Sequence, residues 1–185
     1  MSRFLSKASE SLLPYTPGEQ PQGRKFIKLN TNECPYPPSP KVAEAILAGY
    51  EENSSKIMPL ELANLRLYSD PEERVLIEAI ADHYGVGTNQ VIAGNGSDEI
   101  LGFAFRAFCD QNAPLQFADL TYGFYPALCG LYGIPFKVVP LEEDFTLNIE
   151  PYKNCGNNVI IANPNAPTGM NLPLSAIEEV AASNP

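Results

Sequence analysis

The sequence predicts an α/β fold in which a mostly parallel sheet is flanked by helices in three layers. Short apolar runs rich in β-branched residues alternate along the chain with longer stretches whose apolar residues recur at helical spacing. Strands that alternate with helices are typical of a parallel sheet covered on both faces. A chain of 185 residues, of which 44% are hydrophobic, is long enough to bury a sizeable core.

Composition and charge narrow the class of protein. A formal net charge of -10 disfavours nucleic acids and anionic membranes as partners, so an anionic ligand would need local hydrogen-bond donors. No apolar run is long enough to span a bilayer, and the first residues lack the apolar segment of a secretion signal. We therefore expect a cytoplasmic protein that binds neither membranes nor nucleic acids.

The cysteines and the lone histidine do not predict a metal site. Cys34, Cys109, Cys129 and Cys155 are far apart and form no CxxC pair, so we expect reduced thiols. His83 falls near the end of a predicted helix. At such a position a histidine is more often a structural residue than a metal ligand.

The first part of the chain is expected to contain an irregular arm and two helices. Residues 1–40 are rich in proline and glycine, and Ser39 with Pro40 predicts the start of a helix. A second helix is expected to have Asp70 as its N-cap, Glu73 closing a capping box, and Gly85 as its end. Its expected buried stripe consists of Val75, Leu76, Ala79 and Ile80.

The stretch from residue 90 to residue 108 is the most informative. Residues 90–93 predict a buried strand, residues 94–96 a glycine turn, and residues 97–108 a helix that Ser97 or Asp98 can cap. A helix start after such a turn suits a phosphate, because free N–H groups and the helix dipole favour an anion and glycines let it approach. The alternative is an ordinary turn between strand and helix. The apolar stripe of the helix comprises Ile100, Leu101, Ala104, Phe105 and Phe108.

The remaining elements continue the alternation. We expect strands over residues 115–118, 136–139 and 159–162, a helix that ends near Tyr132, and a last helix that starts near Pro173. The loops 94–98, 119–125 and 163–169 each follow a predicted strand. Because the carboxyl ends of parallel strands meet at one edge, where ligands collect, these three loops should converge.

Two of these loops contain candidate ligand-binding residues. Tyr122 and Tyr125 could stack on a planar ring, or they could be core aromatics. The segment NPNAPTG at 163–169 has two prolines and a glycine that fix its backbone, and its X-Pro bonds can be cis. A loop with a backbone this rigid can orient side chains toward a ligand. The alternative is an ordinary structural turn, but such turns seldom contain two prolines and a glycine together.

Five segments together resemble the fold-type I pyridoxal-phosphate aminotransferases, and within them most closely the histidinol-phosphate aminotransferase family. They are LNTNE (29–33), LRLYSDP (65–71), GNGSDE (94–99), TYGFY (121–125) and NPNAPTG (163–169), in the family's order. The resemblance covers nearly the whole chain. It implies an arm and substrate-side segment over residues 1–40 and the N-terminal part of the cofactor-binding large domain over residues 41–185, with the rest of that domain and the small domain absent.

The resemblance also implies roles around a pyridoxal 5'-phosphate cofactor. Gly96, Ser97 and Asp98 would hold its phosphate, and Tyr122 would stack on its ring. Tyr68 would reach the phosphate bound by the partner subunit of a homodimer.

Residues from the arm would lie near a small amino-acid or phosphate substrate; these are Tyr15, Asn30 and Asn32. One position departs from the family, whose asparagine before Pro-Thr-Gly bonds the cofactor's ring hydroxyl. Ala166 stands there in this chain, so Asn165, Asn163 or a water molecule would have to supply the contact.

The implied activity is transfer of an amino group between L-histidinol phosphate, or a similar amino acid, and 2-oxoglutarate. The family's Schiff-base lysine would follow Pro185, because none of the seven lysines lies in a matching context, so residues 1–185 alone are expected to be inactive. An aromatic or broad-specificity aminotransferase and a threonine-phosphate-type decarboxylase remain alternatives. A non-catalytic phosphate-binding or assembly module is the alternative from another class. A dinucleotide-binding unit is disfavoured, since the third glycine of that fingerprint is missing.

Overall fold

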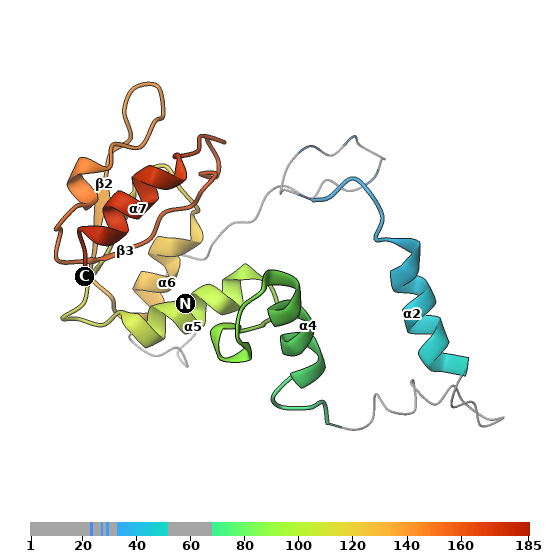
Figure 1. Ribbon diagram of the computed structural model, residues 1–185. Coiled ribbons are helices and arrows are strands. Elements are labelled where there is room, and N and C mark those ends of the chain that lie inside the picture. The colour runs from blue at the N-terminus through green and yellow to red at the C-terminus, as the bar shows by residue number, and fades with distance from the viewer. Residues whose placement is uncertain (1–22, 24–26, 28, 30–32, 52–67) are drawn as a thin grey trace, which may run out of the picture. The chain divides into compact units, whose positions relative to one another are not determined.

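The computed structural model describes residues 23, 27, 29, 33–51 and 68–185, with the backbone alone over residues 46–51. The chain divides into two compact units, one spanning Pro17–Ala93 and the other containing Gly94–Pro185 (Figure 1). The roles expected for Tyr15, Asn30 and Asn32 fall on residues outside the described part.

The second unit is built on a parallel sheet, as predicted. Strand β1 (Leu115–Ala118) lies at the centre and pairs in parallel with β2 (Phe136–Val139) and with β3 (Asn158–Val159). The third strand is shorter than the predicted 159–162. Ile160 still donates its amide to the carbonyl of Gln116 at 3.1 Å, and then the chain leaves the sheet.

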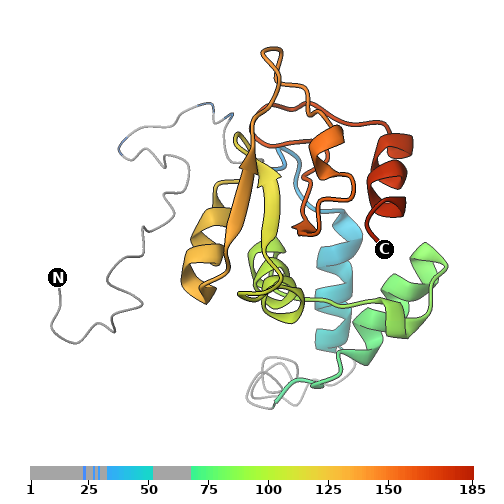
Figure 2. The ribbon, with the colours of Figure 1, turned by 90° about the vertical axis from the view of Figure 1, so that its left-hand side faces the viewer.

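Helices cover both faces of this sheet, which gives the expected three layers. On one face, Leu115 and Phe117 of β1 pack with Phe105 of α5 (Ser97–Phe108) and Leu128 of α6 (Phe124–Tyr132). On the other face, Val139 packs with η2 (Glu150–Tyr152) and α7 (Leu174–Ala182). Figure 2 shows β1 and β2 with α6 on one side and η2 and α7 on the other. The final helix begins next to Pro173, as predicted.

The stretch around residue 97 confirms the predicted helix and corrects its surroundings. Helix α5 has the predicted bounds, but Gly96 is its N-cap and neither Ser97 nor Asp98 caps it with a side chain. Phe108 is exposed rather than part of the buried stripe. The predicted strand over residues 90–93 is wrong: Thr88–Gln90 forms the short helix η1, and residues 91–93 pair with no strand in the described part of the chain. The β-branched residues Val91 and Ile92 favour an extended backbone. A β-strand also requires backbone hydrogen bonds to a neighbouring strand, and none forms here among the described residues.

The first unit contains two described α-helices, α2 (Pro40–Glu51) and α4 (Arg74–Tyr84). Helix α2 starts at the predicted proline. Helix α4 starts later than predicted, because Glu73 adopts a left-handed conformation (φ 49°) and forms no capping box. Asp70 does cap the turn, since its carboxylate accepts bonds from the amides of Glu72 and Arg74.

The structure also tests where α4 ends and which of its side chains are buried. Gly85 ends the helix in a left-handed conformation as predicted, and His83 lies in the last turn. The expected buried stripe is wrong, because Val75, Leu76 and Ala79 are exposed and Ile80 is only half-buried. No helix among the described residues is long and apolar enough to cross a bilayer.

Candidate functional site

The three loops predicted to converge are joined by side-chain hydrogen bonds. The hydroxyl of Tyr122 donates to Oδ1 of Asp98 at 2.6 Å. The hydroxyl of Thr121 donates to Oδ1 of Asn165 at 2.8 Å, and Nδ2 of Asn165 donates to the carbonyl of Leu120 at 2.8 Å. Residues 94–98, 119–125 and 163–169 therefore meet at one rim of the second unit, which confirms the predicted convergence.

The start of α5 offers hydrogen-bond donors to an anion. The amides of Ser97, Asp98 and Glu99 have no acceptor among the described residues, as is usual in a first helical turn. The amide of Asn95 is already used, because it donates to the Glu99 carboxylate (N–Oε2 2.6 Å), so the three amides of α5 are the ones open to a ligand. The donor set thus fits a phosphate.

A glycine is needed at position 96 for the shape of this turn, and Gly94 lies close to side chains of α5. Gly96 has φ 82° and ψ 173°, a region that only glycine occupies readily. A Cβ atom on Gly94 would lie 2.7 Å from Cδ1 of Ile100 and 2.9 Å from Oε2 of Glu99. The backbone conformation therefore requires glycine at 96, whereas at 94 an added Cβ would displace only the ends of two flexible side chains.

The two tyrosines of the middle loop have different positions. Tyr125 is buried and packs against Phe105 and Phe117, with ring centroids 6.0 and 5.7 Å away. It is the core aromatic that the sequence left as one alternative. Tyr122 is half-buried and meets Tyr125 edge-to-face at 5.7 Å, so its ring extends the aromatic core toward the rim.

Asn165 is committed to contacts within the chain. It is 6% exposed, and its Nδ2 donates both to the carbonyl of Leu120 and to the hydroxyl of Thr168 (3.1 Å). Both amide hydrogens are thus in use, and a bond to a ring hydroxyl would require one of them to be released. Ala166 has no side-chain donor, as the sequence indicates. The bonds Asn163–Pro164 and Ala166–Pro167 are both cis.

Two polar residues that the sequence interpretation did not single out hold the middle loop. Asp119 follows β1 directly, and its Oδ1 accepts bonds from the amides of Leu120 and Leu141. Thr121 bonds Asn165, as described above. Their signal in the sequence was their position, since each lies within three residues of the carboxyl end of a predicted strand.

Among the described lysines, Lys153 is held by two carboxylates. Of the seven, the structure describes Lys41, Lys137 and Lys153. Hydrogen bonds to Glu150 and then to Glu179 (Nζ–Oε1 2.7 Å) raise the pKa of Lys153. A lysine nucleophile needs the opposite shift, so Lys153 is a surface ion-pair residue rather than a catalytic one.

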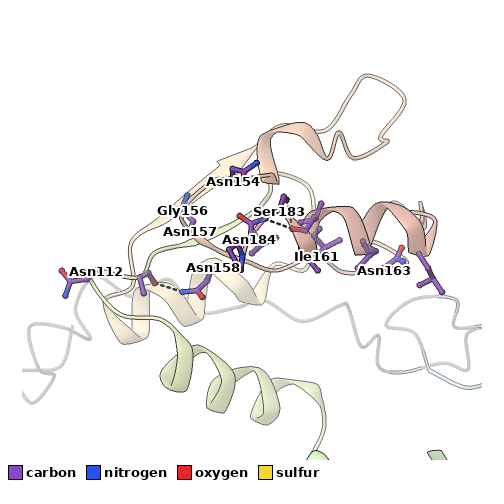
Figure 3. A pocket seen from close by; sticks show the side chains of 16 residues that line it. Asn112, Asn154, Gly156, Asn157, Asn158, Ile161, Asn163, Ser183 and Asn184 are labelled. Atoms are coloured by element: carbon purple, nitrogen blue, oxygen red, sulfur yellow. Dashed lines mark hydrogen bonds between the residues drawn. The ribbon is translucent and has the colours of Figure 1, made fainter.

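Tyr68 and the cavity beside α7 are not part of the rim formed by the three loops. Tyr68 is fully exposed and belongs to the first unit. A cavity of about 1030 Å³ lies between β3 and α7, lined by several asparagines and by none of residues 94–98 or 119–125 (Figure 3). Many of its amides are already bonded; Nδ2 of Asn184, for example, donates to the carbonyls of Tyr152 and Val180 at 2.8 Å. The donors at α5, rather than cavity size, mark the candidate site.

Comparisons with known proteins agree with this geometry. Residues 24–184 match the sequence profile of aminotransferase class I and II. The chain is 48% identical over 184 residues to a histidinol-phosphate aminotransferase of Pseudomonas putida (strain W619), covering 100% of this chain and 50% of that protein. It is 49% identical to histidinol-phosphate aminotransferase 1 of Methylococcus capsulatus, covering 100% of this chain and 48% of that one. The chain thus spans about half the length of the curated relatives it matches.

A solved structure gives the same result for the fold. The chain superposes on histidinol-phosphate aminotransferase from Sinorhizobium meliloti, solved in complex with pyridoxal-5'-phosphate, with a TM-score of 0.78 and 25% identity, covering 100% of this chain and 49% of that one. The family profile covers far more than half of the chain. The chain therefore belongs to the aminotransferase class I and II family.

Proposed function

We propose that these residues form the N-terminal half of the active site of a pyridoxal-phosphate-dependent aminotransferase that acts on L-histidinol phosphate with 2-oxoglutarate. One observation carries the proposal: three loops distant in sequence are bonded to one another beside the unpaired amides of α5. Relatives of about 48% identity over the whole chain are histidinol-phosphate aminotransferases, and a structural relative was solved with this cofactor.

The start of α5 would bind the cofactor phosphate. The amides of Ser97 and Asp98 and the Ser97 hydroxyl provide donors on an exposed helix start, and Gly96 leaves the backbone uncovered. A phosphate there gains from the helix dipole as well as from hydrogen bonds to a charged acceptor.

Tyr122 would orient the cofactor ring, and Asn165 would hold the loop that carries Tyr122. The aromatic contact with Tyr125 supports one edge of the Tyr122 ring, and Asp98 fixes its hydroxyl. Because both amide hydrogens of Asn165 are in use, we assign it a positioning role rather than the direct contact predicted from sequence. When bound, pyridoxal phosphate supplies the electron sink for amino-group transfer.

The remaining sequence predictions are part of the same proposal. Tyr15, Asn30 and Asn32 would contribute to the substrate side, and Tyr68 would reach across a homodimer interface. The arm over residues 1–40, the large-domain part over residues 41–185 and a cytoplasmic location complete it. We also propose that the cofactor-binding lysine is none of the seven in this sequence, so that residues 1–185 alone turn over no substrate.

The test is an assay of the full-length protein with L-histidinol phosphate and 2-oxoglutarate, in which glutamate formation is measured. We expect glutamate with the cofactor present and its loss on treatment that removes the cofactor. Relative rates with phenylalanine and threonine phosphate separate the substrate alternatives. Absence of glutamate with every amino donor, together with a weak and reversible spectral shift that leaves no borohydride-stable adduct, would instead indicate a non-catalytic phosphate-binding module.

A further inference from the structure

The side chain of Asp98 contacts the ring-bearing loop rather than its own helix. Its Oδ1 accepts the Tyr122 hydroxyl at 2.6 Å, which is the length of a hydrogen bond to a charged oxygen. It makes no capping bond to α5. One residue thus joins the start of α5 to a tyrosine 24 positions further along the chain.

Tyr122 is held at its two ends by different forces. Its ring lies 5.7 Å from Tyr125 and 6.2 Å from Phe124, and Tyr125 is itself buried against Phe105 and Phe117. These apolar contacts fix where the ring lies. They are compatible with rotation and tilt of a half-buried side chain, because aromatic pairs tolerate a range of geometries. The bond to Asp98 removes that freedom by fixing the hydroxyl.

A carboxylate at this point also has a cost for an anionic ligand. Asp98 lies in the first turn of α5, whose unpaired amides would receive a phosphate, and like charges at short range repel. An aspartate there is therefore unfavourable for phosphate binding unless its side chain is turned away and bonded. The Tyr122 hydroxyl provides that bond.

We propose that the Asp98 carboxylate is a positioning residue that fixes the Tyr122 ring and thereby sets the geometry between the phosphate turn and the ring platform. The inference rests on the proposed cofactor site. It assigns Asp98 two separate parts, with its amide directed to the phosphate and its carboxylate to the tyrosine.

The experiment uses four variants of the full-length protein: D98A, D98N, Y122F and D98A/Y122F. Y122F keeps the charge and the ring but loses the bond, whereas D98N loses the charge but keeps an acceptor oxygen. Pyridoxal 5'-phosphate is titrated into each, and the dissociation constant and the circular dichroism induced in the cofactor's absorption band are measured. The induced signal reports ring orientation, which a purely structural contact would leave unchanged. The same four proteins are unfolded in urea without cofactor to measure the coupling of the two side chains.

We expect D98A and Y122F each to weaken cofactor binding about tenfold, the order for loss of a hydrogen bond to a charged group, and to reduce the induced signal alike. The double variant should be no worse than either single one, and D98N should restore the signal. Equal effects of D98A and D98N with an unchanged Y122F would mean that only charge matters, and would overturn the inference. If the wild type binds no cofactor, the proposed function fails and the positioning role fails with it; if it binds normally while all variants match it, only the positioning role fails. Should D98A not fold, D98N and Y122F decide between these outcomes.

Discussion

Replacing Asn165 with alanine tests whether the rim is held together before any ligand binds. The substitution removes three side-chain bonds, to Thr121, Leu120 and Thr168, of 2.8, 2.8 and 3.1 Å. It leaves the two backbone bonds of the residue, from its amide to the Met170 carbonyl and from the Gly169 amide to its own carbonyl, both 2.7 Å. The loop should therefore keep its path while losing its tie to residues 120–121.

The size of the stability loss depends on whether the former partners of Asn165 can form hydrogen bonds to water instead. A typical internal hydrogen bond contributes about 1 kcal/mol net, so three give an upper figure of about 3 kcal/mol. The hydroxyls of Thr121 and Thr168 are half-buried and Leu120 is exposed, so that part of this loss is recovered by hydration. We expect a decrease of about 2 kcal/mol in the free energy of unfolding. With a urea m-value of about 2 kcal/mol/M, the midpoint should fall by roughly 1 M.

The assay is urea unfolding followed by far-ultraviolet circular dichroism, with Asn171→Ala as the matched control. Asn171 is an asparagine from the same region but is exposed, so its replacement should change the free energy of unfolding by less than about 0.5 kcal/mol. Cofactor affinity should fall in N165A and not in N171A, because only the former releases the Tyr122 loop. Equal midpoints for the two variants would refute the reasoning that Asn165 joins the loops.

Three further outcomes are expected. Gly96→Ala should lower the free energy of unfolding by about 1–3 kcal/mol and weaken phosphate binding, because φ 82° with ψ 173° strains any residue with a Cβ. Urea unfolding measures the first effect and cofactor titration the second. Tyr152→Phe should leave stability unchanged or raise it by about 1 kcal/mol, because the fully buried hydroxyl has no partner among the described residues; a fall of that size in the unfolding free energy would contradict this. Burial, with a smaller effect of Cys109, raises the pKa of Cys129 to about 12, so at pH 8 a thiol reagent should label exposed Cys34 in the native protein and Cys129 only after unfolding, as mass spectrometry of the labelled peptides would show.

Local sequence was sufficient for the elements whose signals are local. The helix Ser97–Phe108 and the strands Leu115–Ala118 and Phe136–Val139 were predicted with the bounds they have, because periodicity, glycines and prolines act over a few residues. The meeting of loops 119–125 and 163–169 also followed from the sequence, since both come after strands of one parallel sheet. Loop 94–98 joins them through the bond between Asp98 and Tyr122, although the strand expected before it does not form. Burial was less predictable: Phe108 lies on the apolar stripe of its helix but in its last turn, where it is 72% exposed.

The amino-acid sequence by itself determined the order of strands and helices from residue 97 onward, the glycine turn before α5 and the five motifs of the family. The tertiary structure alone decided how the polar side chains of that rim are used. Asp98 was expected to cap a helix and instead bonds Tyr122, and Asn165 was expected to face a ligand and instead has both amide hydrogens bonded within the chain. The reason is physical: a capping or ligand-binding residue type is specified by its own chemistry, whereas its partner is whichever donor or acceptor folding places within about 3 Å of it.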